Sequence, residues 1–185
     1  MKKRQVKIVV LCEDGEHESF VCGYLGKHGY VPGRYRVLKS RPGVGSGKRF
    51  VQLQYVTEVA EMRRYHRINK PGSYGLLALI DADADTVDSV YRGMDDRLEE
   101  AQLGTRGSDE SIALLVPKRN IGTWTYHLLD TARDVDESTD YERRHSVSHP
   151  DFRQAGVAFA SYSSTAERLP SLLRGCKERD RIPGM

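Results

Sequence analysis

Cysteine is scarce in this chain and is not arranged as a set of metal ligands or as a disulfide framework. The three cysteines, Cys12, Cys22 and Cys176, lie far apart and form no C-x-x-C pair. A structural zinc site and a disulfide-stapled fold are therefore not expected. Long hydrophobic runs are missing as well, because no stretch approaches the roughly 18 apolar residues that a membrane-spanning helix needs. We accordingly expect no membrane anchor and no zinc-stabilised module.

The N-terminus lacks the features of a secretory signal. The sequence MKKRQVKIVVLCEDGE begins with basic residues, but its apolar part, 8–12, is short and leads directly into acidic residues. It also has no cleavage site of small residues. We interpret this segment as the first strand of a cytoplasmic protein.

A strong excess of one charge is absent overall, but the two signs are unevenly distributed. The 185 residues carry a net charge of +3. Charged residues make up 30% of the chain and hydrophobic residues 38%, which is typical of an ordinary globular domain. Residues 1–70 hold 15 Lys and Arg against 6 Asp and Glu, whereas residues 71–117 hold 3 against 10. This division suits a protein that grips phosphates and binds cations, although two solvated faces of opposite sign would produce the same counts.

Strand-like and helix-like segments alternate along the chain. Apolar, β-rich runs predict strands at 6–12, 34–40, 74–81 and 111–117, and helical spacing predicts helices at 16–29, 48–68, 87–102 and from 121 onward. Residues 130–146 are polar and predict a loop or lid, and 164–181 predicts a helix interrupted by Pro170. The alternation indicates an α/β fold, with a mostly parallel sheet of about four strands, helices on both faces and a helical C-terminal appendage.

Acidic residues follow two of the predicted strands. Glu13 comes directly after the first strand, and the apolar run LLALI leads into Asp81, Asp83 and Asp85. Because the carboxyl ends of parallel strands meet at one edge of a sheet, we expect these groups to lie together. Crowded like charges call for a compensating cation, and oxygen ligands favour Mg²⁺ or Mn²⁺ over zinc. Helix capping and loop solvation explain one or two of these acids, but explain clusters at both strand ends poorly.

Basic residues occur where they could contact the backbone of a nucleic acid. The candidates are Arg41, Lys48 and Arg49 around the loop after the second strand, Arg63, Arg64 and Arg67 on the helix 48–68, and Arg119 after the fourth strand. Lys118 would neutralise charge on a phosphate. The stretch RPGVGSGKRF resembles a nucleotide-binding loop, but Pro42 replaces its first glycine and Arg49 its Ser or Thr, so a nucleotide site is the weaker alternative.

Three other signals are weaker. The run DADTV resembles the signature of haloacid-dehalogenase phosphatases, but that family begins with this strand, which would leave the long preceding segment unexplained. His145 and His149 have helical spacing but no acidic or cysteine partner nearby, so a solvated polar segment is favoured over a metal site. Trp124, the only tryptophan, could stack on a base but is favoured as a core residue.

The segment VVLCEDGEHESF, followed by a later strand that ends in D-x-D, resembles the Toprim domain. Toprim domains occur in topoisomerases, in bacterial primases and in nucleases of the overcoming-lysogenization-defect group. The cluster EDGEHESF resembles in particular the small Toprim-like proteins of prokaryotic defence systems and mobile elements, including the RloB-like group. The resemblance covers about residues 6–130. It implies a Toprim-like catalytic domain at 1–130, with a polar loop and a helical extension packed on it at 131–185.

The resemblance implies a Mg²⁺-dependent nuclease of an antiviral defence system. Its catalytic residues would be Glu13, Asp81, Asp83 and Lys118, and its cation ligands would come from Glu13, Glu18, Asp81, Asp83 and Asp85. Relatives commonly carry a glutamate or another polar residue just before the tryptophan, where this chain has Gly122 and Thr123, so this stretch is not expected to supply a third metal ligand. The alternative is a nucleic-acid-binding or regulatory subunit that is active only in a complex. Because the ATPase module of the larger nucleases is missing, we expect a protein partner such as an ATPase subunit, and a homo-oligomer remains open.

Overall fold

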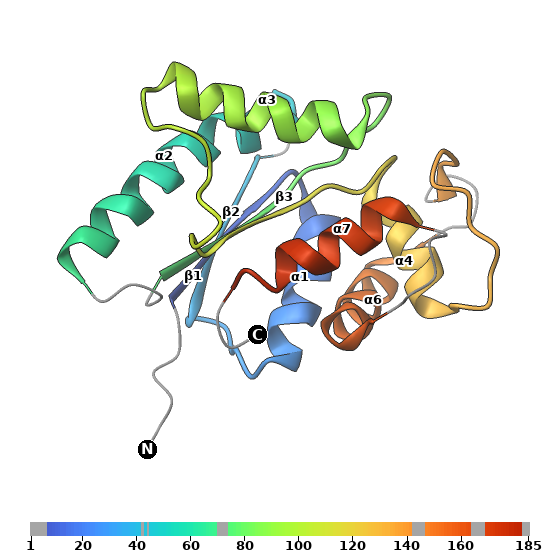
Figure 1. The fold of residues 1–185 in the computed structure, drawn as a ribbon. Coiled ribbons are helices and arrows are strands. Elements are labelled where there is room, and N and C mark those ends of the chain that lie inside the picture. Colours follow the sequence, from blue (N-terminus) through green and yellow to red (C-terminus); the bar gives the residue numbers. More distant parts are fainter. Residues whose placement is uncertain are drawn as a thin grey trace.

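Four strands pair side by side in a single parallel sheet of order β2-β1-β3-β4. The computed structural model describes residues 7–41, 43, 45–69, 74–141, 147–163 and 169–182. The strands are β1 (Lys7–Cys12), β2 (Tyr35–Lys39), β3 (Tyr74–Leu79) and β4 (Ile112–Leu115). With helices on both sides of this sheet (Figure 1), the predicted α/β class is confirmed.

Helices connect the strands and complete the C-terminal part. They are α1 (Gly15–Lys27), α2 (Gly47–Ile68), α3 (Val87–Glu100), α4 (Ile121–Leu129), α6 (His149–Ser161) and α7 (Pro170–Arg179). The start of α3 agrees with the sequence, since the side chain of Thr86 accepts a hydrogen bond from the backbone N–H of Ser89 at 3.0 Å. Within the described ranges, no helix has the length and apolar character needed to cross a membrane.

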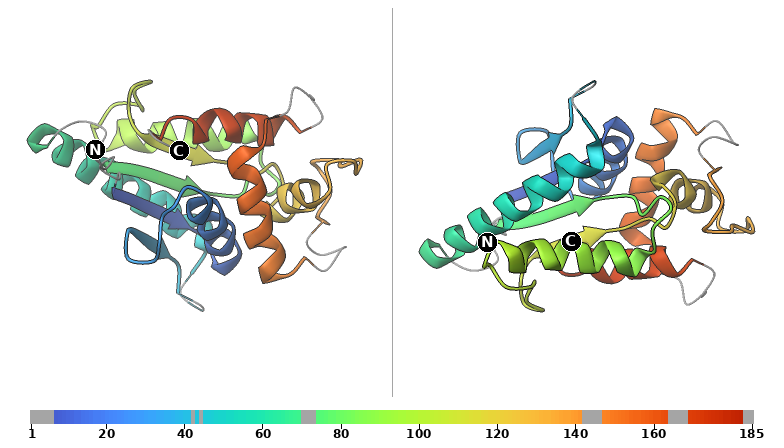
Figure 2. Two further views of the ribbon diagram at one scale, coloured as in Figure 1. Left: turned by 90° about the horizontal axis from the view of Figure 1, so that it is seen from below. Right: turned by 90° about the horizontal axis from the view of Figure 1, so that it is seen from above.

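Each strand serves two separate cores, because successive side chains point to opposite faces of the sheet. On β1, Ile8 and Val10 pack with α1, α4, α6 and α7, whereas Val9 and Leu11 pack with α2 and α3. Figure 2 shows these two helical layers from below and from above. All six residues of β3 are buried, as expected for a central strand covered on both faces.

The C-terminal part differs from the sequence-based expectation. Helix α6 was not predicted, because Gly156 and polar residues interrupt its apolar positions. Its buried residues Phe152 and Phe159 belong to the same core as α1 and β1. Leu169 has a non-helical backbone and Pro170 begins α7, a position at which its missing N–H costs nothing, whereas 164–168 of the predicted helix lie outside the described residues. Of the loop predicted at 130–146, residues 130–140 contain no helix or strand, as expected. Residues 142–146, which include His145, lie outside the described residues.

Candidate functional site

Two carboxylates meet where the central strands of the sheet end. Glu13 directly follows β1, and Asp81 follows β3 after one intervening residue. The two strands are hydrogen-bonded neighbours, with Leu11 level with Ala78, so both acids stand at the same edge. The backbone N–H of Asp81 donates a hydrogen bond to Oε1 of Glu13 at 2.8 Å. The structure thus brings these two predicted residues together.

A buried histidine stands behind Asp81. His17, in the first turn of α1, is fully buried, and its Nε2 lies 3.1 Å from Oδ1 of Asp81. The two groups attract as opposite charges, without the alignment of a hydrogen bond. Nδ1 of the ring accepts a long hydrogen bond, of 3.5 Å, from the backbone N–H of Glu13. Sequence reasoning missed His17, and the only signal for it was its position one helical turn after Glu13.

Burial makes both carboxylates harder to ionise than free acids. It raises the pKa of Glu13 to about 7, although the charge of His17 opposes the change. Burial also raises the pKa of Asp81, again against the influence of His17. Burial lowers the pKa of His17 itself and is the largest single influence, but the interactions with Asp81 and the charges of Asp14 and Glu13 together outweigh burial and raise that pKa to about 10. A single imidazolium therefore compensates the negative charge of this pair only in part.

A lysine ammonium compensates the next two aspartates. Nζ of Lys48, in the first turn of α2, lies 3.0 Å from Oδ2 of Asp83 and 3.2 Å from Oδ2 of Asp85. It also donates a hydrogen bond to the carbonyl oxygen of Ala82 at 3.3 Å. The lysine side chain is only 19% exposed, whereas the two aspartate side chains are 58% and 61% exposed. Lys48, which was predicted to contact nucleic acid, is thus bound to residues that were predicted to hold a cation.

The other predicted residues of this edge also have partners within the chain. Glu18 forms an ion pair with Lys39, the last residue of β2. Nζ of Lys118 donates a hydrogen bond to the carbonyl oxygen of Asp85 at 2.6 Å. Arg119 donates a longer one, of 3.5 Å, to the carbonyl oxygen of Asp83. The two basic side chains that follow β4 therefore stand beside the aspartates.

A cavity of about 350 Å³ opens beside Glu13 on the side of β2. Its lining consists of Glu13, Asp14, Gly15, Lys39, Ser40, Arg41, Gly43, Gly45 and Gly47. Gly47 lets α2 touch the chain after β1, because a Cβ there would lie 2.7 Å from the carbonyl oxygen of Glu13. The cavity therefore joins two carboxylates, two basic side chains and the first residues of α1 and α2.

The predicted basic face of α2, formed by Arg63, Arg64 and Arg67, lies at the opposite edge of the sheet. The helix begins at the acidic edge and runs back along the strands, so that Nε2 of His66 lies 3.1 Å from the carbonyl oxygen of Tyr74, where β3 begins. Arg63 is bound to Glu110, with Nη2 and Oε2 separated by 2.8 Å, and to loop carbonyl groups. The structure does not bring this face together with the acids.

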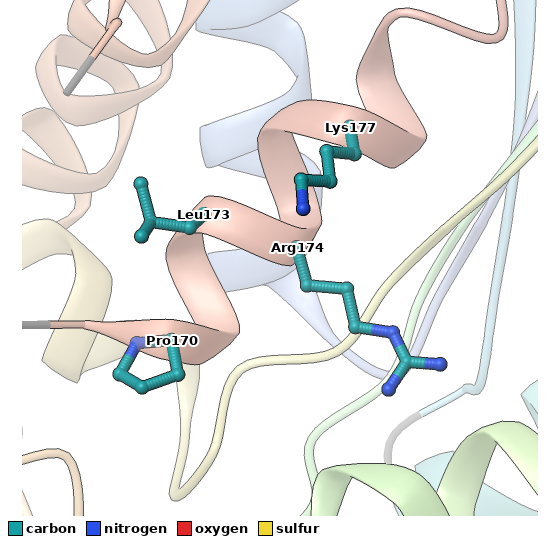
Figure 3. A pocket seen from close by; sticks show the side chains of 4 residues that line it. All are labelled: Pro170, Leu173, Arg174 and Lys177. Carbon is teal, nitrogen blue, oxygen red and sulfur yellow. The ribbon is translucent and has the colours of Figure 1, made fainter. Parts of the chain in front are cut away.

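A hollow of about 580 Å³ lies on the outer side of α7. Figure 3 shows its lining residues, Pro170, Leu173, Arg174 and Lys177. The guanidinium of Arg174 reaches α3, where it lies 3.5 Å from the centre of the Tyr91 ring and pairs with Asp88. Arg174 therefore links α7 to α3, and none of the four lining residues is a carboxylate that would attract a cation.

The described residues contain no preformed metal site with three or more ligands, because no group of three or more His, Cys, Asp or Glu side chains converges among them. Gly122 and Thr123 are buried at the start of α4 and supply no carboxylate. Comparison with known protein families, with curated proteins and with solved structures found no match to this chain.

Proposed function

We propose that the protein is a Mg²⁺- or Mn²⁺-dependent nuclease that hydrolyses phosphodiester bonds of DNA or RNA. The main support is the meeting of Glu13 and Asp81, two desolvated carboxylates, at the carboxyl edge of a parallel sheet. Sites of parallel α/β sheets form beyond this edge, and hard divalent cations select carboxylate oxygens. A Toprim-type origin, a role in prokaryotic antiviral defence and a cytoplasmic location are parts of the same proposal.

The residues at this edge fit a cation that is held by few protein ligands. Mg²⁺ usually keeps several waters and binds through one or two carboxylates plus phosphates of the substrate. Glu13 and Asp81 would be these carboxylates, with Oδ1 of Asp81 facing Nε2 of His17 at 3.1 Å. When bound, the cation would neutralise phosphate charge and activate a water molecule. Asp83 would join the ligands once Lys48 is displaced.

Basic groups around the acids suit the phosphates of a substrate. Lys39 and Arg41 line the cavity beside Glu13, and Lys118 and Arg119 stand on the other side of the aspartates. Lys118 would stabilise charge that develops on the phosphate during hydrolysis. His17 would hold Asp81 in place, because it packs against the carboxylate from the buried side.

A cleavage assay with the purified chain tests this proposal. Plasmid DNA, single-stranded DNA and RNA are incubated with Mg²⁺, Mn²⁺ or EDTA. We expect slow cleavage that Mn²⁺ stimulates and EDTA abolishes. Cleavage should be slow because the ammonium of Lys48 forms ion pairs with Asp83 and Asp85 in the free protein. A chain that neither cleaves nor binds any of these substrates would contradict the proposal.

The same lysine favours a second candidate function, that of a nucleic-acid-binding or regulatory subunit. If the ammonium of Lys48 stays on Asp83 and Asp85, the isolated chain holds at most one cation and lacks the pair used in two-metal hydrolysis. A protein partner, such as an ATPase subunit or another copy of the chain, would then have to displace Lys48. Tight binding without cleavage, and cleavage only after such a partner is added, would favour this function.

Replacing Lys48 by methionine should increase the number of cations that the free protein binds. The substitution leaves the charges of Asp83 and Asp85 uncompensated, so that a divalent cation becomes the available counter-charge. Calorimetric titration with Mn²⁺ should find one cation per wild-type chain and two per Lys48→Met chain. Lys27→Met, at an exposed lysine of α1, is the control and should behave as the wild type. Equal stoichiometry in all three proteins would show that Lys48 does not exclude a cation.

Nucleic-acid binding should depend on the basic residues at the acidic edge and not on those at the far end of α2. We expect the triple variant Arg41→Ala, Arg49→Ala, Arg119→Ala to bind a single-stranded oligonucleotide more weakly. The dependence of log K on log salt should flatten by about one unit for each lost phosphate contact. The double variant Arg64→Ala, Arg67→Ala serves as the control and should keep the wild-type slope. A wild-type slope for the triple variant together with a flatter slope for the double variant would place the binding surface on the C-terminal half of α2.

A further inference from the structure

His149, the first residue of α6, lies beside Gly15 of the cavity lining, although the two residues are far apart in sequence. A Cβ on Gly15 would lie 3.3 Å from Cε1 and 3.7 Å from Nε2 of His149. The absence of a side chain at Gly15 therefore allows the imidazole to approach the first turn of α1. Gly15 also lines the cavity beside Glu13, so the ring stands next to the wall of that cavity.

The packing of α6 on α1 holds His149 in this place. Oγ of Ser19 donates a hydrogen bond to the carbonyl oxygen of His149 at 2.9 Å, across 130 positions of the chain. The carboxylate of Asp151 accepts a hydrogen bond from the backbone N–H of Ser148 at 2.8 Å, which closes the first turn of α6. Gly23 brings the two helices into backbone contact, because a Cβ there would lie 2.0 Å from the carbonyl oxygen of Arg153.

The imidazole of His149 is available to a ligand. The residue is exposed, and its ring makes no hydrogen bond or ion pair with the described residues. The other histidines of the described ranges are engaged differently. His17 is buried against Asp81, His28 packs edge-on against Tyr24, and His66 and His127 contact polar oxygens.

We propose that His149 is a substrate-contacting residue, whose ring donates a hydrogen bond to a phosphate group of the nucleic acid that enters the cavity. The inference rests on the proposed function and specifies which part of the substrate is recognised. It also assigns the segment that contains α6 a role in the site. Lys39 and Arg41 would hold the same phosphate backbone from the β2 side of the cavity.

Binding measurements on matched variants test this inference. With a single-stranded oligonucleotide in EDTA, His149→Ala should raise the Kd about tenfold, as expected for the loss of one charge-assisted hydrogen bond. His149→Gln keeps a donor at similar reach and should recover part of the affinity. Gln154→Ala, at an exposed position of the same helix, is the control and should bind as the wild type. A wild-type Kd for His149→Ala would overturn the inference and leave the nuclease proposal intact.

A second measurement keeps the inference testable if nucleic acid is not the ligand. The Cε1–H proton NMR signal of His149, assigned by its disappearance in His149→Gln, is followed during titration with inorganic phosphate. A saturable shift of this signal that is absent from His28 and His66 supports the contact, even if the cleavage assay fails. A signal that phosphate does not move, or that moves together with those of the other histidines, contradicts it.

Discussion

Glu13→Gln is expected to lower Mg²⁺-dependent cleavage by at least about 100-fold, since even the loss of a residue that only orients a metal ligand costs up to this much. The amide is nearly isosteric with the carboxylate, and its oxygen can still accept the hydrogen bond from the backbone N–H of Asp81, now at 2.8 Å. The substitution removes a negative charge that burial and Asp81 already make unfavourable. The melting temperature in EDTA should therefore stay the same or rise slightly.

Asp81→Asn distinguishes loss of a cation ligand from loss of structure. Cleavage should again be lost. In contrast to Glu13→Gln, stability should fall, because the buried imidazolium of His17 loses the negative charge of Asp81 that compensates it. Asp96→Asn, at an exposed acid of α3, is the matched control and should leave both cleavage and stability unchanged. Cleavage by Glu13→Gln and Asp81→Asn at the wild-type rate would show that the reaction does not use this pair.

Gly156→Ala is expected to destabilise the protein by about 3 kcal/mol or more, at the upper end of the range for overpacked cores. A Cβ at this position of α6 would lie 1.9 Å from the carbonyl oxygen of Phe20 and 2.9 Å from the backbone nitrogen of Tyr24. Both atoms belong to the backbone of α1, so no change of rotamer relieves the overlap and the two helices must separate. Urea unfolding followed by circular dichroism measures the change.

The control for this variant is Gly93→Ala in α3, where a Cβ would meet nothing within 4 Å. Alanine should stabilise that helix by up to about 1 kcal/mol, because its helix propensity exceeds that of glycine. If Gly156→Ala unfolded at the same urea concentration as the wild type, α6 would not pack on α1 in the way described. The place of His149 beside Gly15 would then be wrong as well.

Local patterns in the sequence were sufficient for most of the elements. The uninterrupted apolar run before Asp81 predicted a strand, and β3 is a strand whose six residues are all buried. Helical spacing from residue 87 predicted α3, and the hydroxyl of Thr86 caps that helix by accepting a hydrogen bond from the backbone N–H of Ser89. The meeting of Glu13 and Asp81 at one edge was also predictable, because parallel strands that alternate with helices must end on the same side.

The contacts of the charged residues at the carboxyl edge of the sheet depend on packing between distant segments, and no local sequence pattern encodes them. Lys48 was predicted to bind phosphate because it follows a glycine-rich loop, yet the path of α2 places its ammonium on Asp83, 35 positions later. His149 was interpreted as part of a solvated segment, since the glycine contacts that bring α6 onto α1 are invisible in the periodicity of either helix. Hydrophobic period and capping residues specify single elements, whereas the partner of each charged group is decided only when the two helical layers close on the sheet.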